Sequence, residues 1–94
     1  MNKKYESVFI IKEDCNKKNI ISEIDKIITT QKAKISRTDE LGLKKLAYEI
    51  RKNKNGYYYV VYFEIGNNNN QIVKIQKHIN TIEEILKLII VKVD

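Results

Sequence analysis

The sequence predicts an α+β domain whose elements follow the order βαββαβ. Four stretches of β-branched and aromatic residues alternate in this order with two stretches in which isoleucine recurs at helical spacing. At 94 residues the chain is long enough to bury a hydrophobic core and too short for two domains of ordinary size. We therefore expect residues 1–94 to form a single domain.

The first strand is predicted at Tyr5–Ile11, and an amphipathic helix follows it. The strand has few polar interruptions, which is typical of a strand at the centre of a sheet. Asp14 and Asn16 are both candidate N-caps of the helix. Its apolar stripe has the spacing i, i+1, i+4, i+7, i+8 and consists of Ile20, Ile21, Ile24, Ile27 and Ile28.

The next two strands are predicted to form a hairpin. The first is Ile35–Arg51, in which Gly42 indicates a bulge or a close approach of two backbones. A turn is predicted at Asn53–Gly56, and the strand Tyr57–Ile65 follows it. Alternation divides this strand into two faces, Tyr57, Tyr59, Val61, Phe63 and Ile65 against Tyr58, Val60, Tyr62 and Glu64. We expect the face that carries Glu64 to be the more exposed.

A loop at Asn67–Asn70, a second helix and a fourth strand complete the prediction. The helix carries Ile72, Ile75 and Ile79 on one stripe, and the strand is Ile85–Val93. This element order predicts a ferredoxin-like fold, an antiparallel sheet with strand order 4-1-3-2 and both helices on one face. The first and third strands would be the central pair, and the other face of the sheet would be left open.

The charge balance favours an anionic partner. Eighteen Lys and Arg residues against twelve Asp and Glu give a formal net charge of +6, and the pI is near 9.4. Lysine, isoleucine and asparagine are also the residues that an AT-rich coding sequence produces. The total charge therefore does not identify nucleic acid by itself.

Several classes of function are disfavoured. Cys15 is the single cysteine, and with the single His78 it falls short of a four-ligand zinc site, so we expect no metal and no cofactor. No secretory signal and no apolar run of about 18–20 residues is present, which argues against a membrane and favours an internal compartment. No catalytic motif or Gly-rich phosphate loop occurs, so neither enzymatic activity nor a small-molecule substrate is expected. The position of Cys15 near a helix N-terminus could lower its pKa, but because it has no partner residue we expect it to be an incidental small residue.

Basic residues are expected to gather at one end of the sheet. Lys3 and Lys4 open the first strand and Lys92 closes the fourth, so an antiparallel pairing brings them together. Lys34 and Arg37 should lie toward the same end. Contacts of such a cluster with phosphates would make binding strongly dependent on salt.

The open face should carry Tyr58, Val60 and Tyr62. These residues could form a platform for stacking bases or an apolar patch for a protein partner. Residues 55–59 lack the second glycine of the RNA-recognition motif of four-stranded sheets, so the protein partner is the favoured interpretation.

Residues 40–48, Glu-Leu-Gly-Leu-Lys-Lys-Leu-Ala-Tyr, followed by Ile50 and by Gly-Tyr-Tyr-Tyr at 56–59, resemble a family signature. The family is that of the sixth protein of the bacterial-type small ribosomal subunit, with the pattern G-x-[KR]-[KR]-L-A-Y-x-I, a short polar turn and G-Y. The resemblance extends to the Lys-Lys-Tyr-Glu opening at residues 3–6 and to Val-Lys at 91–92.

This resemblance implies a non-enzymatic role without cofactors in the ribosome, in the cytoplasm or in an organelle with bacterial-type ribosomes. It implies binding to the central region of small-subunit ribosomal RNA together with the eighteenth protein of that subunit, as a heterodimer. By position in the family pattern, Tyr58 and Val60 would face the protein partner. The residues that would face the RNA are Lys3, Lys4, Lys44, Lys45, Lys87 and Lys92.

Two positions depart from the family pattern, and two other functions remain open. Glu49 stands where proline is common, and Leu86 stands where a basic residue is common. A ferredoxin-like regulatory or self-associating module could use the same open face. A small acyl-phosphate hydrolase would need a basic, anion-binding loop after the first strand, where this chain instead carries Glu13 and Asp14.

Overall fold

The computed structural model describes residues 3–66 and 70–93 and confirms the predicted element order. Most of the predicted loop at 67–70 lies outside the described residues, and its last residue, Asn70, begins the second helix. The elements are β1 (Lys3–Lys12), α1 (Lys17–Thr30), β2 (Lys34–Ile50), β3 (Asn53–Ile65), α2 (Asn70–Asn80) and β4 (Ile85–Val93).

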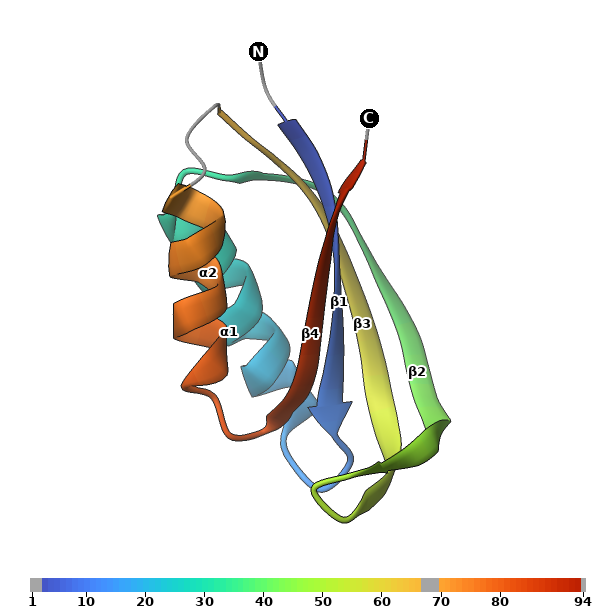
Figure 1. Cartoon of the computed structure of the whole chain (residues 1–94). Coiled ribbons are helices and arrows are strands. Elements are labelled where there is room, and N and C mark those ends of the chain that lie inside the picture. The colour runs from blue at the N-terminus through green and yellow to red at the C-terminus, as the bar shows by residue number, and fades with distance from the viewer. Residues whose placement is uncertain (1–2, 67–69, 94) are drawn as a thin grey trace.

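The four strands form one antiparallel sheet in the order β2-β3-β1-β4. This is the predicted order 4-1-3-2 listed from its other edge, with β1 and β3 as the central pair. Both helices cover the same face of the sheet, and the opposite face is open (Figure 1). The ferredoxin-like fold is thus confirmed.

Local sequence explains where α1 begins. Asn16, rather than Asp14, is the N-cap, and its Oδ1 accepts a hydrogen bond from the backbone N–H of Asn19 at 3.3 Å. The apolar stripe then buries Ile20, Ile24 and Ile28 against the sheet.

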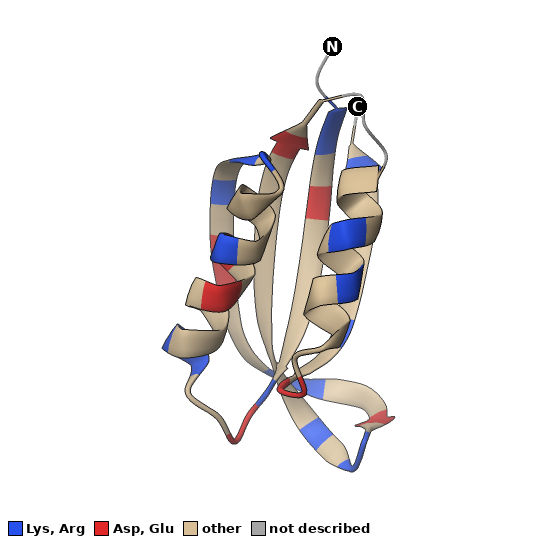
Figure 2. Ribbon diagram, turned by 90° about the vertical axis from the view of Figure 1, so that its left-hand side faces the viewer, with Lys and Arg blue, Asp and Glu red and all other residues tan. Residues whose placement is uncertain are grey.

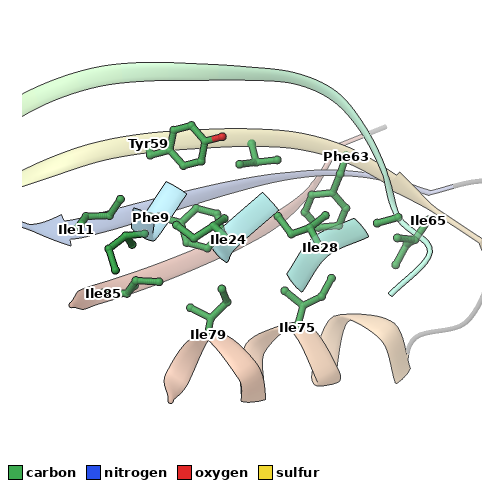
Figure 3. Close-up of a cluster of buried hydrophobic side chains, with 13 residues drawn as sticks. Phe9, Ile11, Ile24, Ile28, Tyr59, Phe63, Ile65, Ile75, Ile79 and Ile85 are labelled. Atoms are coloured by element: carbon green, nitrogen blue, oxygen red, sulfur yellow. The ribbon is translucent and has the colours of Figure 1, made fainter. Parts of the chain in front are cut away.

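The hydrophobic core lies between the helices and the inner face of the sheet (Figure 3). The isoleucines of α1 and α2 meet side chains that alternate along β1 and β3, as the predicted faces of the third strand require. The fully buried members include Phe9, Ile11, Val61, Phe63, Ile75 and Ile79. Since the core occupies the inner face, a binding surface must use the open face, the sheet ends or the hairpin between β2 and β3.

The predicted bulge at Gly42 is confirmed. The pairing of β2 with β3 shifts register between Glu40 and Gly42, and the φ of Gly42 is 86°. Because residues with a side chain rarely adopt this left-handed backbone conformation, glycine suits the bulge.

The predicted turn at Asn53–Gly56 is wrong, since β3 already begins at Asn53. The turn consists of Arg51 and Lys52, whose φ values of 47° and 66° are both left-handed, as a two-residue primed turn requires. The side-chain amide of Asn53 donates to the carbonyls of Ile50 at 3.2 Å and Arg51 at 3.0 Å. These hydrogen bonds stabilise a backbone conformation that the sequence alone would assign to glycine or asparagine.

Gly56 is needed for packing rather than for a turn. It lies within β3, and a Cβ atom there would clash with Cγ2 of Ile10 and lie 3.3 Å from Cδ2 of Leu46. The missing side chain lets the tip of β2 fold against the open face.

Candidate nucleic-acid interface and open sheet face

Basic side chains are concentrated at the tip of the β2–β3 hairpin, residues 44–54, which we call the basic hairpin. It extends beyond the helices at one end of the sheet (Figure 2). The segment contains one acidic residue, Glu49, which is exposed. Its five basic residues are all exposed, and they are Lys44, Lys45, Arg51, Lys52 and Lys54.

Two contacts fix the basic hairpin to the rest of the fold. The side chain of Leu46 is only 7% exposed and lies near Ile10 and Gly56. The Arg51 guanidinium donates a hydrogen bond to the backbone carbonyl of Ile85 at 2.6 Å, at the start of β4. The positive charges therefore sit on a segment that is held against the open face and against β4, the strand at the opposite edge of the sheet.

Lys87 belongs to the same end of the molecule. It is exposed and lies opposite Ile10 in the β1–β4 pairing, two residues beyond the carbonyl that Arg51 binds. On β2, the Lys44 ammonium lies 5.7 Å from the ring centroid of Tyr58, within the range of a cation–π contact. Three of the six predicted RNA-facing residues, Lys44, Lys45 and Lys87, are thus neighbours of the basic hairpin or part of it.

The other three lie at the opposite end of the sheet. Lys4 pairs with Val93, and Tyr5 pairs with Lys92, so the predicted meeting of Lys3, Lys4 and Lys92 is confirmed. Strand geometry places Lys4 about 20 Å from Ile10, the residue opposite Lys87. The six predicted residues therefore form two separate groups. The sequence did not predict this separation, because the family pattern does not show how far apart along the strands the basic residues lie.

Acidic residues lie among the basic residues at this end of the open face. Glu64 lies opposite both Lys4 and Lys34 in the two pairings. The guanidinium of Arg37 lies over the ring of Tyr62, 4.4 Å from its centroid, and forms an ion pair with Asp39 at 3.1 Å. This end is a surface of mixed charge, unlike the basic hairpin.

The apolar part of the open face lies mainly on β4. Ile89, Val91 and Val93 are 42%, 53% and 39% exposed, respectively. Val60, one of the two predicted partner-facing residues, is on the open face but only 4% exposed, and Tyr58 is half-buried. Side chains of the strands on either side flank those of the central strand β3 and reduce their exposure. The edge strand β4 therefore supplies most of the accessible apolar surface.

The sequence pattern did not identify these residues of β4, or the basic residues 51, 52 and 54, as parts of a binding surface. In β4 apolar residues occupy both alternating positions, so the exposed face became evident only from the pairing with β1. The basic residues are adjacent in the sequence Arg-Lys-Asn-Lys, and this local charge run was the available signal.

Metal-ligating side chains and the cysteine were the remaining candidates for site chemistry. Within residues 3–66 and 70–93, no group of three or more His, Cys, Asp or Glu residues could hold a metal ion. Burial raises the pKa of the Cys15 thiol above its usual value, contrary to the suggested effect of the helix N-terminus, and its Sγ donates to the Lys12 carbonyl at 3.1 Å. A raised pKa lowers the fraction of reactive thiolate at neutral pH.

None of the helices in the described part of the chain has the length and apolar character needed to span a membrane.

Comparison with known proteins identifies the family. The sequence profile of the family described as Ribosomal protein S6 matches residues 4–92. The chain belongs to this family. The match confirms the resemblance inferred from residues 40–48 and 56–59.

Named relatives agree with this assignment. The family member called small ribosomal subunit protein bS6 in Helicobacter pylori (strain Shi470) is 35% identical over 91 residues, which are 94% of this chain and 63% of that protein. The protein of the same name in Sulfurovum sp. (strain NBC37-1) is 33% identical over 94% of this chain and 70% of its own length. The chain thus spans slightly less than two thirds of the length of the Helicobacter relative.

Two solved structures share the fold, and one of them is of the family. The crystal structure of 30S ribosomal protein S6 from Thermotoga maritima has a TM-score of 0.91 and 29% identity, covering 99% of this chain and 89% of that one. The P2 domain of the chemotaxis kinase CheA from Thermotoga maritima has a TM-score of 0.68 at 19% identity, covering 99% of this chain and 100% of that one. The second likeness shows the ferredoxin-like fold alone.

Proposed function

We propose that the protein is a structural constituent of the small ribosomal subunit that binds the central region of its ribosomal RNA. The observation that carries this proposal is the basic hairpin, where five of the chain's eighteen basic residues lie within eleven positions beside a single carboxylate. Arginine and lysine on a fixed segment bind phosphates and set the register of a protein on RNA. Family membership supports RNA as the anionic partner.

The two groups of basic residues would contribute unequally. Lys44, Lys45 and Lys87 lie on or beside the basic hairpin and would make the main phosphate contacts. Lys3, Lys4 and Lys92 would form a second contact region at the other end of the sheet. Its contribution would be smaller, because Glu64 lies beside Lys4 and repels phosphate.

The open face would bind the eighteenth protein of the small subunit, forming a heterodimer. Exposed apolar residues on β4 favour a protein partner there over solvent. Tyr58 and Val60 would lie at the inner margin of this contact, and Ile89 and Val91 would supply most of its apolar area.

The role would be non-enzymatic and independent of cofactors, and it would be performed in the ribosome. The ribosome would be in the cytoplasm or in an organelle with bacterial-type ribosomes. The RNA contacts would stabilise one arrangement of an RNA junction by holding its phosphates, after the partner has covered the open face.

The alternative is a self-associating ferredoxin-like module. The same apolar residues of β4 could then contact a second copy of the chain. Sedimentation velocity distinguishes the two, since a stable homodimer at micromolar concentration favours self-association over the ribosomal role.

A reconstitution experiment tests the proposed function. The purified chain, labelled with a fluorophore, is mixed with small subunits depleted of their own sixth protein and sedimented through sucrose. We expect the chain to co-sediment, and a variant with Lys44→Gln and Lys45→Gln to do so much more weakly. The matched control carries Lys74→Gln and Lys77→Gln on the exposed side of α2, with the same loss of charge. Equal loss with both variants would contradict a site on the hairpin, and no co-sedimentation of the unmodified chain would contradict the function.

A further inference from the structure

A small hollow lies between the basic hairpin and the end of the open face. Its volume is about 110 Å³. Residues of all four strands line it, because the tip of β2 folds toward the part of the sheet where β1 pairs with β3 and β4. The side chains that line it include Ile10, Leu46, Tyr48, Ile50, Tyr58 and Lys87.

Tyr48 is the unusual member of this lining. It is 71% exposed, the largest value among the large apolar residues in the described part of the chain that are exposed. Tyr48 is not part of the hydrophobic core. It also has no partner in the β2–β3 pairing, which is interrupted between Lys45 and Ile50. An aromatic ring that is accessible next to a hollow is suited to stack on a flat ligand.

The electrostatic surroundings indicate the chemistry of that ligand. Lys87 lines the hollow directly, and the Lys44 ammonium lies 5.7 Å from the ring centroid of Tyr58, the second aromatic residue of the lining. Arg51 is three positions from Tyr48 along the hairpin. A ligand that suits both features has a flat aromatic part and attached negative charge, which describes a nucleotide.

We propose that this hollow binds one unpaired base of an RNA, with Tyr48 stacking on the base while Lys44 and Lys87 hold flanking phosphates. The inference rests on the proposed function and extends it from phosphate contacts to a base-binding site. A base in a continuous duplex is stacked on its neighbours and cannot enter, whereas a bulged or junction base can. The site would therefore give preference for RNA with an unpaired base over uninterrupted duplex.

Contacts within the protein fix the residues that line the hollow. The hydrogen bond from Arg51 to the Ile85 carbonyl and the burial of Leu46 fix the tip of the hairpin. The glycine at position 56 leaves room for Leu46 and Ile10 to pack closely. A preformed site avoids much of the ordering cost of binding.

Two RNA hairpins test the proposal. Both carry a 5′ fluorophore and the same stem, and one contains a single bulged adenosine. Fluorescence anisotropy at 50 mM KCl measures the affinity of the whole chain for each. We expect the bulged RNA to bind more tightly, and Tyr48→Ala to weaken binding to it by about 5- to 150-fold, as loss of one stacked base predicts. Binding to the uninterrupted stem should change by less than about twofold.

Two further variants and a folding control make the outcome decisive. Tyr48→Phe should retain the preference, because it keeps the ring and removes only the hydroxyl. Val73→Ala is the control for loss of an exposed apolar side chain, since Val73 is 47% exposed on α2. Circular dichroism melts should show that Tyr48→Ala folds with a melting temperature within about 3 °C of the unmodified chain, as an exposed site allows.

Each result has a defined meaning. If the chain binds both RNAs equally, or if Tyr48→Ala weakens both alike, the base site is wrong. If Lys44→Gln nevertheless weakens both RNAs, the phosphate-binding function still stands. If the chain binds neither RNA, the base site is wrong, and co-sedimentation with the depleted small subunits decides separately whether the RNA-binding function stands.

Discussion

The hydroxyl of Tyr59 donates a hydrogen bond to Oδ1 of Asp25 at 2.8 Å, linking the centre of the sheet to α1. Tyr59 is 2% exposed, and Asp25 is half-buried. Burial is the main cause that raises the pKa of the Asp25 carboxyl, and the hydrogen bond from Tyr59 partly opposes it. For Tyr59, burial first and the adjacent carboxylate second raise the pKa well above its usual range.

Replacing Tyr59 by phenylalanine should destabilise the fold by about 1–2 kcal/mol, since the half-buried carboxylate loses a donor. The pKa of Asp25 should then rise further, because the interaction that lowers it is gone. Urea unfolding measures the first effect, and an NMR titration of the Asp25 carboxyl carbon measures the second. An unchanged pKa would show that the hydrogen bond does not act on Asp25.

Replacing Asp25 by asparagine should remove the pH dependence of stability that this residue contributes. A carboxyl whose pKa is raised by folding binds protons more readily in the folded state, so its ionisation lowers stability as pH rises through its titration range. Asparagine offers an acceptor to Tyr59 and cannot ionise. The free energy of unfolding of Asp25→Asn relative to the unmodified chain should therefore increase from pH 3 to pH 6, as measured by urea titrations, and a decrease would contradict the sign.

Replacing Gly56 by alanine should destabilise the fold by about 1–3 kcal/mol, the usual cost of overpacking. The added methyl group would meet Ile10 and Leu46. Gly66→Ala is the matched control, because a Cβ there meets no atom within 4 Å. Thermal melts of the two variants should differ clearly, and equal melting temperatures would show that Leu46 can move away at little cost.

Replacing Arg51 by lysine should loosen the basic hairpin while the net charge stays the same. Loss of the hydrogen bond to the Ile85 carbonyl should cost about 0.5–1.5 kcal/mol in local stability. Hydrogen exchange followed by mass spectrometry should then be faster at the amides of residues 46–52. Exchange at the core strand β1 should stay slow, and faster exchange everywhere would indicate global destabilisation instead.

The salt dependence of RNA binding should report the phosphates that the hairpin contacts. Each contact with a duplex phosphate changes the slope of log K against log salt concentration by about −0.9. The double variant Lys44→Gln and Lys45→Gln should therefore be less salt-dependent by a slope of about 1.8. Anisotropy titrations between 50 and 200 mM KCl measure it, and the α2 variant with Lys74→Gln and Lys77→Gln should keep the original slope.

Residue patterns alone predicted most of the fold. The helical spacing from Ile20 to Ile28, the alternation in Tyr57–Ile65 and the glycine at the bulge can each be read from a short stretch of sequence, and the structure contains each feature. The turn was misplaced because Arg51 and Lys52 are poor turn residues by type. Their conformation is stabilised by the Asn53 side chain and by the bond to Ile85, a residue 34 positions from Arg51.

The sequence by itself determined the element order, the inner face of the sheet and the family, because periodicity and a continuous motif are local properties. Only the tertiary structure decided which charges act together. Strand register places Lys3, Lys4 and Lys92 at one end, with Lys4 opposite Glu64, and places Lys87 beside the hairpin at the other. It also decided that Val60 is covered while Ile89 and Val91 are exposed, because a side chain's exposure depends on the strands that lie beside its own.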